Sequence, residues 1–66
     1  MNRLDLHGVK HEDVDRLVEN FVLLHDPPMR IITGNSDMMT KLVLKVLKRH
    51  NIGYEKFAPS HITILR

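Results

Sequence analysis

Hydrophobic and polar residues alternate along the chain in two rhythms, one typical of strands and one typical of helices. In residues 3–7, RLDLH, leucines alternate with polar residues, which predicts a strand with Leu4 and Leu6 directed inward. Residues 29–33, MRIIT, are β-branched and bounded by turn residues, which predicts a second strand. Near the end of the chain, YEKF and HITIL predict two more strands, and the short APS between them predicts a hairpin turn.

Two other segments repeat apolar residues at helical spacing. The first covers residues 11–25, and its predicted apolar face consists of Val14, Leu17, Val18, Phe21 and Leu24. The second runs from about Asp37 to His50, and its predicted apolar face consists of Met39, Leu42, Val43, Val46 and Leu47. Two prolines, at positions 27 and 28, end the first helix. Gly53 is available as a left-handed cap for the second helix.

The element order is therefore β-α-β-α-β-β, which predicts an α/β two-layer sandwich in one domain over residues 1–66. Strand-helix-strand units place their strands parallel, and hairpin strands pair antiparallel. We expect a four-stranded mixed sheet with both helices on one face. Because strand side chains alternate, Arg3, Asp5 and His7 are expected on the other face.

Composition narrows the class of protein. The chain contains no cysteine, so it has neither disulfides nor thiolate zinc ligands. An apolar run of the roughly 18 residues needed for a membrane helix is missing from the sequence, as is a signal-peptide pattern. We therefore expect a soluble, cytoplasmic domain that is a monomer or a weak homodimer and has no membrane partner. The net charge of +2 mildly favours anionic partners.

The LDLHG segment carries the first candidate chemistry. Ligands of open α/β sheets bind beyond the carboxyl ends of parallel strands, where His7 and Gly8 are expected. His7 can act there as a general acid or base, with Asp5 orienting or charging it, and His11 is close enough to assist. The alternative is an exposed strand end that happens to contain titratable residues.

The TGNSD segment carries the second. Gly34 permits a turn with positive φ, and the following helix start presents N–H groups suited to a phosphate. The alternative is an ordinary N-cap formed by Asn35 or Ser36. Lys10 and Arg30 are placed to add positive charge to this edge.

Other basic and aromatic residues have two interpretations each. Lys41, Lys45 and Lys48, with Arg49 beside them, form a stripe that suits either a nucleic-acid backbone or a solvated helix face. Tyr54 or Phe57 is able to stack on a base, although we expect at least one of them in the core. His50 extends the apolar face of the second helix, and we interpret it as partly buried packing.

The order of LDLHG, a helix with an acidic first turn, RIITG, a second helix and a closing hairpin resembles a small MutS-related (Smr) domain. The resemblance spans nearly the whole chain. It implies a fold similar to the C-terminal domain of translation initiation factor three, nucleic-acid binding and, as in many Smr domains, endonuclease activity. The family's two motifs fall on Asp5, His7, Gly8, Thr33 and Gly34. Ser36 stands where the family usually has a second glycine.

The resulting hypothesis is an endonuclease that cleaves RNA or nicks DNA. His7 would transfer a proton, and Asp5 would orient His7 or hold a divalent cation such as Mg²⁺ or Mn²⁺. The turn of Gly34, Asn35 and Ser36 would hold the phosphate. Two alternatives remain: a nucleic-acid-binding module without catalysis, and a protein-interaction or homodimerisation domain on the same fold.

Overall fold

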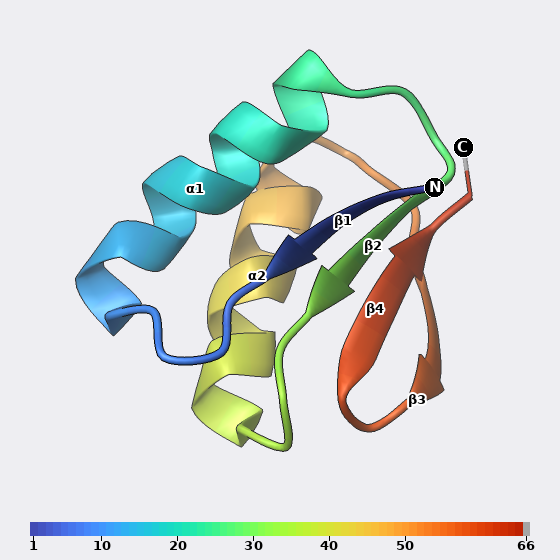
Figure 1. The fold of residues 1–66 in the computed structure, drawn as a ribbon. Helices are drawn as coiled ribbons and strands as arrows, with labels where there is room; N and C mark the ends of the chain where they lie inside the picture. Colours follow the sequence, from blue (N-terminus) through green and yellow to red (C-terminus); the bar gives the residue numbers. More distant parts are fainter. Residues whose placement is uncertain (66) are drawn as a thin grey trace.

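The computed structural model describes residues 1–65, and its elements follow the expected order (Figure 1). The strands are β1 (Asn2–Asp5), β2 (Met29–Ile32), β3 (Glu55–Ala58) and β4 (His61–Ile64), and the helices are α1 (His11–Leu24) and α2 (Asp37–Arg49). The first strand ends two residues earlier than predicted. It stops at Asp5 because the chain turns at His7 and Gly8, with Gly8 at a φ of 79°.

The four strands form one mixed sheet in the order β1-β2-β4-β3. β1 and β2 are parallel neighbours, whereas β4 is antiparallel to both β2 and β3. The predicted four-stranded mixed sheet is therefore confirmed. The last strand in the sequence lies inside the sheet, between β2 and β3.

Both helices cover one face of the sheet (Figure 1), as predicted. Ile31 and Ile62 are paired across β2 and β4 and are fully buried beneath the helices, and Leu4 continues the same row on β1. The core is completed by fully or nearly fully buried side chains from both layers: Leu6, Val14, Val18, Phe21, Val22, Met29, Met39, Val43, Val46, Leu47 and Ile64. Alternation along the strands turns Arg3, Arg30 and Thr63 to the opposite side of the sheet, which we call the open face.

The predicted buried face of α1 is wrong at Leu24, and it omits Val22, which is buried. Leu24 is 77% exposed. The side chain that covers Phe21 at the end of α1 is His25, four residues on, and not Leu24, three residues on. Four residues come closer than three to one full helical turn. The His25 and Phe21 rings lie with their centroids 4.8 Å apart. The His25 Nδ1 atom also lies 3.0 Å from the carbonyl oxygen of Phe21 and covers it at the helix end.

The end of α2 also differs from the prediction. Asn51, and not Gly53, adopts the left-handed conformation, with a φ of 56°. The N–H of Asn51 donates to the carbonyl of Lys48, and the N–H of Ile52 donates to the carbonyl of Leu47. These two bonds form a Schellman motif, in which asparagine is the usual substitute for glycine.

The two aromatic residues of the β3 region separate as expected. Tyr54 is half-buried and packs against the core, whereas Phe57 is 70% exposed. Between Glu55 and Ala58, β3 contains a bulge, because three steps along β3 match two steps along β4. The bulge breaks strict alternation, so the exposure of Phe57 does not follow from a simple strand pattern.

Candidate functional site at the strand-end edge

Three turns meet at one end of the strands, where β1 and β2 end and β4 begins. We call this border of the sheet the strand-end edge. β1 and β2 are parallel and end in register, with Asp5 paired to Ile32, and the N–H of Leu6 donates to the carbonyl of Ile32 at 2.9 Å. The loops after the two strands therefore leave from the same edge (Figure 1). β4 runs the opposite way and begins with His61 beside Ile32, so the β3–β4 turn lies at this edge as well.

In the first loop, Asp5 acts on the backbone. Its Oδ1 accepts the backbone N–H of His7 at 2.9 Å, and the N–H of Val9 donates to the carbonyl of Leu6 at 3.0 Å. These bonds close a tight turn in which Gly8 supplies the positive φ. The side chains of Asp5 and His7 are both exposed. The carboxylate thus fixes the turn that presents His7, through its main chain and not through its imidazole.

In the second loop, Thr33 and Gly34 are held by the β3–β4 turn. Their backbone N–H groups both donate to the carbonyl of Ser60, at 2.8 and 3.1 Å. The Thr33 hydroxyl lies 3.2 Å from the same oxygen, and the Thr33 residue is only 3% exposed. Thr40, which is buried in the first turns of α2, donates its hydroxyl hydrogen to the carbonyl of Ser36. Thr33 therefore positions the loop from inside the fold.

The start of α2 is a capped helix end. The Ser36 hydroxyl accepts the N–H of Met39 at 3.1 Å, so Ser36, and not Asn35, is the N-cap. Asn35 is exposed. The backbone N–H groups of Asn35 and Ser36 donate to no other residue within 1–65. These two N–H groups lie beside the positive end of the α2 dipole and, with the first-turn N–H groups of Asp37 and Met38, which are likewise unpaired within the described chain, can donate to an oxyanion at this edge.

The predicted cations occupy different positions around the edge. Lys10 is exposed immediately before α1, and within the described chain it forms no side-chain cap on that helix. His11 is the first residue of α1 and is also exposed. Arg30 is half-buried on the open face, two residues before the end of β2. Arg30 therefore lies one row behind the edge.

One residue of this edge escaped the sequence analysis. His61, at the start of β4, pairs with Ile32, which in turn pairs with Asp5. It is half-buried and belongs to the open face, in the same row as Asp5. The alternation of HITI, with Ile62 and Ile64 buried, indicated that His61 faces outward. Only the strand order places it near the LDLHG turn.

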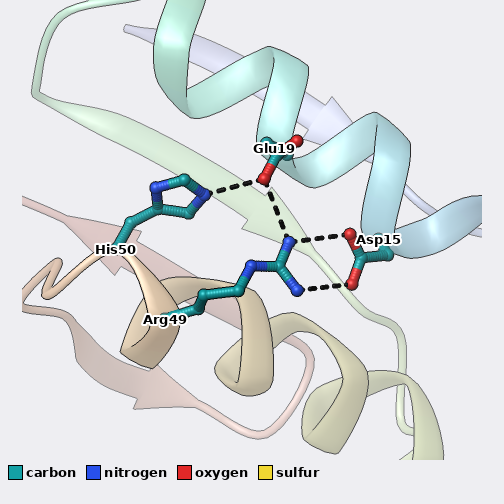
Figure 2. Close-up of polar contacts among 4 residues, drawn as sticks. All are labelled: Asp15, Glu19, Arg49 and His50. Atoms are coloured by element: carbon teal, nitrogen blue, oxygen red, sulfur yellow. Dashed lines mark hydrogen bonds and ion pairs between the residues drawn. The ribbon is translucent and has the colours of Figure 1, made fainter.

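A second charged cluster joins the two helices (Figure 2). The Arg49 guanidinium donates to Asp15 at 2.8 and 2.9 Å and to Glu19 at 3.0 Å, and His50 Nε2 lies 2.9 Å from Glu19. Arg49 therefore pairs with acidic residues of α1 instead of extending the lysine stripe. His50 is partly buried, as expected, and also contacts the Glu19 carboxylate. Arg49 is the last residue of α2 and so lies about 18 Å along the helix from the edge at which α2 begins, whereas Asp15 is only about one turn into α1.

This cluster shifts the protonation of its members. The Arg49 hydrogen bond lowers the pKa of Asp15 below its ordinary value of 3.8. The His50 hydrogen bond, followed by that of Arg49, lowers the pKa of Glu19 below 4.5. Asp15 and Glu19 in turn raise the pKa of Arg49. The cluster is open to solvent, so it links the helices but is no enclosed reaction site.

Three further observations bear on ligands. A hollow lined by Gly53, Tyr54, Glu55 and Leu65 lies at the start of β3, whereas the candidate edge lies at the end of that strand. In the part of the chain that the structure describes, no three His, Asp or Glu side chains are grouped so as to hold a metal ion. Neither helix among residues 1–65 combines the length and the apolar character needed to cross a membrane.

Comparisons of the chain with models of protein families, with curated proteins and with solved structures gave no match. The resemblance to Smr domains thus stays a prediction from the sequence. The fold is established at the coarser level, as an α/β sandwich with a four-stranded mixed sheet and two helices on one face.

Proposed function

We propose that this chain binds nucleic acid and cleaves its phosphodiester bonds at the strand-end edge. The observation that carries the proposal is the meeting of the LDLHG turn and the TGNS turn, which the β1–β2 pairing brings to one edge. The Ser60 carbonyl fixes the TGNS turn there. Strand ends of this kind are where open α/β sheets bind ligands. The Smr-like motifs fall on the same two turns.

Two histidines support acid–base chemistry at this edge. His7 is exposed on the first turn, and His61 belongs to the same row as Asp5 two strands away. Neighbouring strands are about 4.8 Å apart, so roughly 10 Å separates the β1 and β4 backbones, and the scissile group would lie between them. One imidazole would accept the proton of the nucleophile, which is the 2′-hydroxyl of RNA or, for DNA, a water molecule, and the other would protonate the leaving oxygen. The N–H groups of Asn35 and Ser36 would stabilise the developing charge on the phosphate.

The test is a cleavage assay on labelled single-stranded RNA, duplex DNA and branched DNA, each with Mg²⁺, with Mn²⁺ and with chelator. We expect His7→Gln and His61→Gln each to lower the cleavage rate by about 100-fold or more, as for removal of a general acid or base. His25→Gln is the matched control, since His25 follows the far end of α1. Each active-site variant should also lose one limb of a bell-shaped pH–rate profile. Equal rates for wild type and both variants would remove the histidines from the mechanism.

A second function, nucleic-acid binding without cleavage, is favoured by one specific observation. Asp5 and Thr33 are both used to hold turns, and the N–H groups of Thr33 and Gly34 are bonded to Ser60. These motif residues would then build a phosphate-binding edge and nothing more. A gel shift without product after long incubation would select this function. Neither shift nor product would contradict both and point to a protein partner.

A further inference from the structure

Two arginines lie side by side on the open face. The register of the parallel pair places Arg3 of β1 directly beside Arg30 of β2, and the next pairing places Thr63 of β4 beside Arg30. Paired residues on neighbouring strands turn their side chains to the same face, with backbones about 4.8 Å apart. We call Arg3, Arg30 and Thr63 the diarginine row.

The charges of this row are not neutralised by the described chain. The arginine ion pairs within residues 1–65 belong to Arg16 and Arg49, and neither Arg3 nor Arg30 takes part in one. Like charges directly opposite each other in a sheet are unfavourable. Such a pair is therefore expected to attract an anion between its two members.

Two polar atoms of the same row are also unsatisfied. The Arg30 Nε and the Thr63 Oγ1 are buried and have no hydrogen-bond partner among the described residues. Thr63 as a whole is only 3% exposed, although it belongs to the face away from the helices. Buried polar groups are normally paired, and an unpaired one calls for an explanation such as a ligand.

We propose that the diarginine row is a phosphate-binding subsite. Guanidinium groups form paired, charge-assisted hydrogen bonds with phosphate oxygens, and two of them side by side bracket one phosphate group. The exposed Arg3 makes the first contact. Arg30 then turns outward, which opens its Nε and the Thr63 hydroxyl to phosphate oxygens or solvent.

The position of the row relates it to the proposed cleavage edge. Arg3 and Asp5 share one face of β1 and are two residues apart, about 6.6 Å along the strand. A nucleic-acid strand with one phosphate at the edge would therefore carry a neighbouring phosphate over the diarginine row. Glu55, which pairs with Thr63, repels an anion on the β3 side. The anionic nucleic-acid strand would therefore lie over β1 and β2. The choice of a nucleic-acid phosphate rests on the proposed function.

The experiment measures binding and not cleavage. Fluorescence anisotropy would follow an end-labelled single-stranded deoxyoligonucleotide in chelator, with wild type, Arg3→Gln, and Arg3→Gln/Arg30→Gln. The matched control is Lys41→Gln/Lys45→Gln, which removes the same charge from α2. We expect at least a tenfold loss of affinity in the double arginine variant. Its slope of log affinity against log salt should also fall by about 0.7, for the one single-strand phosphate contact that the two arginines share.

A second arm identifies the source of the phosphate. Inorganic phosphate would be added to the protein while NMR follows the chemical shifts of the backbone amides of residues 3, 30 and 63. The titration would be run first with phosphate alone and then in competition with the oligonucleotide. Displacement only at phosphate concentrations far above those of the oligonucleotide supports a nucleic-acid backbone. Tight binding of inorganic phosphate, with no oligonucleotide binding, would overturn that assignment in favour of a small phosphate ligand.

The outcomes separate this inference from the proposed cleavage. Arg3→Gln is exposed and should leave the thermal midpoint unchanged, so its binding loss reports on the site even if Arg30→Gln unfolds the chain. Equal affinities of wild type, the arginine variants and the lysine control would overturn the subsite while cleavage by His7 stands. A selective binding loss in a chain that cleaves nothing would support the subsite and leave binding as the function.

Discussion

Side chains of the LDLHG and TGNS motifs form hydrogen bonds with the backbone, and the residue type alone does not identify the partner. Asp5 accepts the His7 N–H, Thr33 lies buried against the Ser60 carbonyl, and Ser36 caps α2. The residue types were informative, because aspartate, threonine and serine are the side chains that bond to nearby backbone. Asp5 and Ser36 find partners two and three residues away. By contrast, the partner of Thr33 is Ser60, 27 residues away in the hairpin turn.

The capping role of Ser36 leads to a stability prediction. Ser36→Ala should lower the free energy of unfolding by about 1 kcal/mol, because the Met39 N–H loses its acceptor at a half-buried helix start. Urea denaturation followed by circular dichroism measures the change. Asn35→Ala is the control, since Asn35 is exposed and should change stability by less than about 0.5 kcal/mol. Equal losses of unfolding free energy in the two variants would contradict the assignment of Ser36 as the N-cap.

Among the elements, the two helices are joined by charge as well as by apolar packing. The sequence predicted their apolar faces well, because helical spacing is local and the core residues of α2 follow it. It did not predict the Arg49 cluster, since Asp15 and Arg49 are 34 residues apart in the chain. The predictions for Leu24 and Gly53 were wrong because periodicity does not specify which residue of the last turn packs on the core, and composition does not specify which residue caps the helix.

The cluster predicts a pH dependence of stability. The folded-state pKa values of Asp15 and Glu19 are lowered, so their contribution is complete above their ordinary values of 3.8 and 4.5. It is lost as the pH falls through the lower folded-state values. Arg49→Gln should therefore reduce the urea midpoint at pH 7, and the difference from wild type should shrink below pH 4.5.

Lys48→Gln provides the control for that comparison, because Lys48 precedes Arg49 and takes part in no ion pair within the described residues. Its urea midpoint should follow wild type at every pH. A difference between Arg49→Gln and wild type that is constant from pH 7 to pH 3 would separate the Arg49 effect from carboxylate ionisation.

For the whole molecule, the element order was sufficient to predict the layers and the parallel direction of β1 and β2, but not which strands are neighbours in the sheet. A hairpin can add to the sheet by either of its strands, and the choice depends on which strand is apolar enough to be central. Ile62, Ile64 and the buried Thr63 make β4 that strand, whereas β3 is mostly exposed. This choice brings His61 to the candidate edge and Thr63 beside Arg30.

A chain of this size has little stability to lose. For 66 residues the free energy of unfolding is expected to be roughly 3–10 kcal/mol. Leu47→Ala truncates a fully buried side chain and should cost about 2–5 kcal/mol, a large fraction of this stability, so the thermal midpoint should fall markedly. Leu24→Ala, at an exposed position, should change stability by less than about 0.5 kcal/mol. Similar thermal midpoints for the two variants would contradict the described core.

The place of β4 in the sheet also has a consequence for biosynthesis. Residues 61–64 are made after the other strands, yet β2 and β3 meet only through them. While this segment is still inside the ribosomal exit tunnel, the nascent chain can pair β1 with β2 but leaves the inner edge of β2 without a neighbour. The Ser60 carbonyl, which fixes Thr33 and Gly34, arrives just as late. The strand-end edge therefore cannot be completed until residues 60–64 have been translated, well after its own motifs.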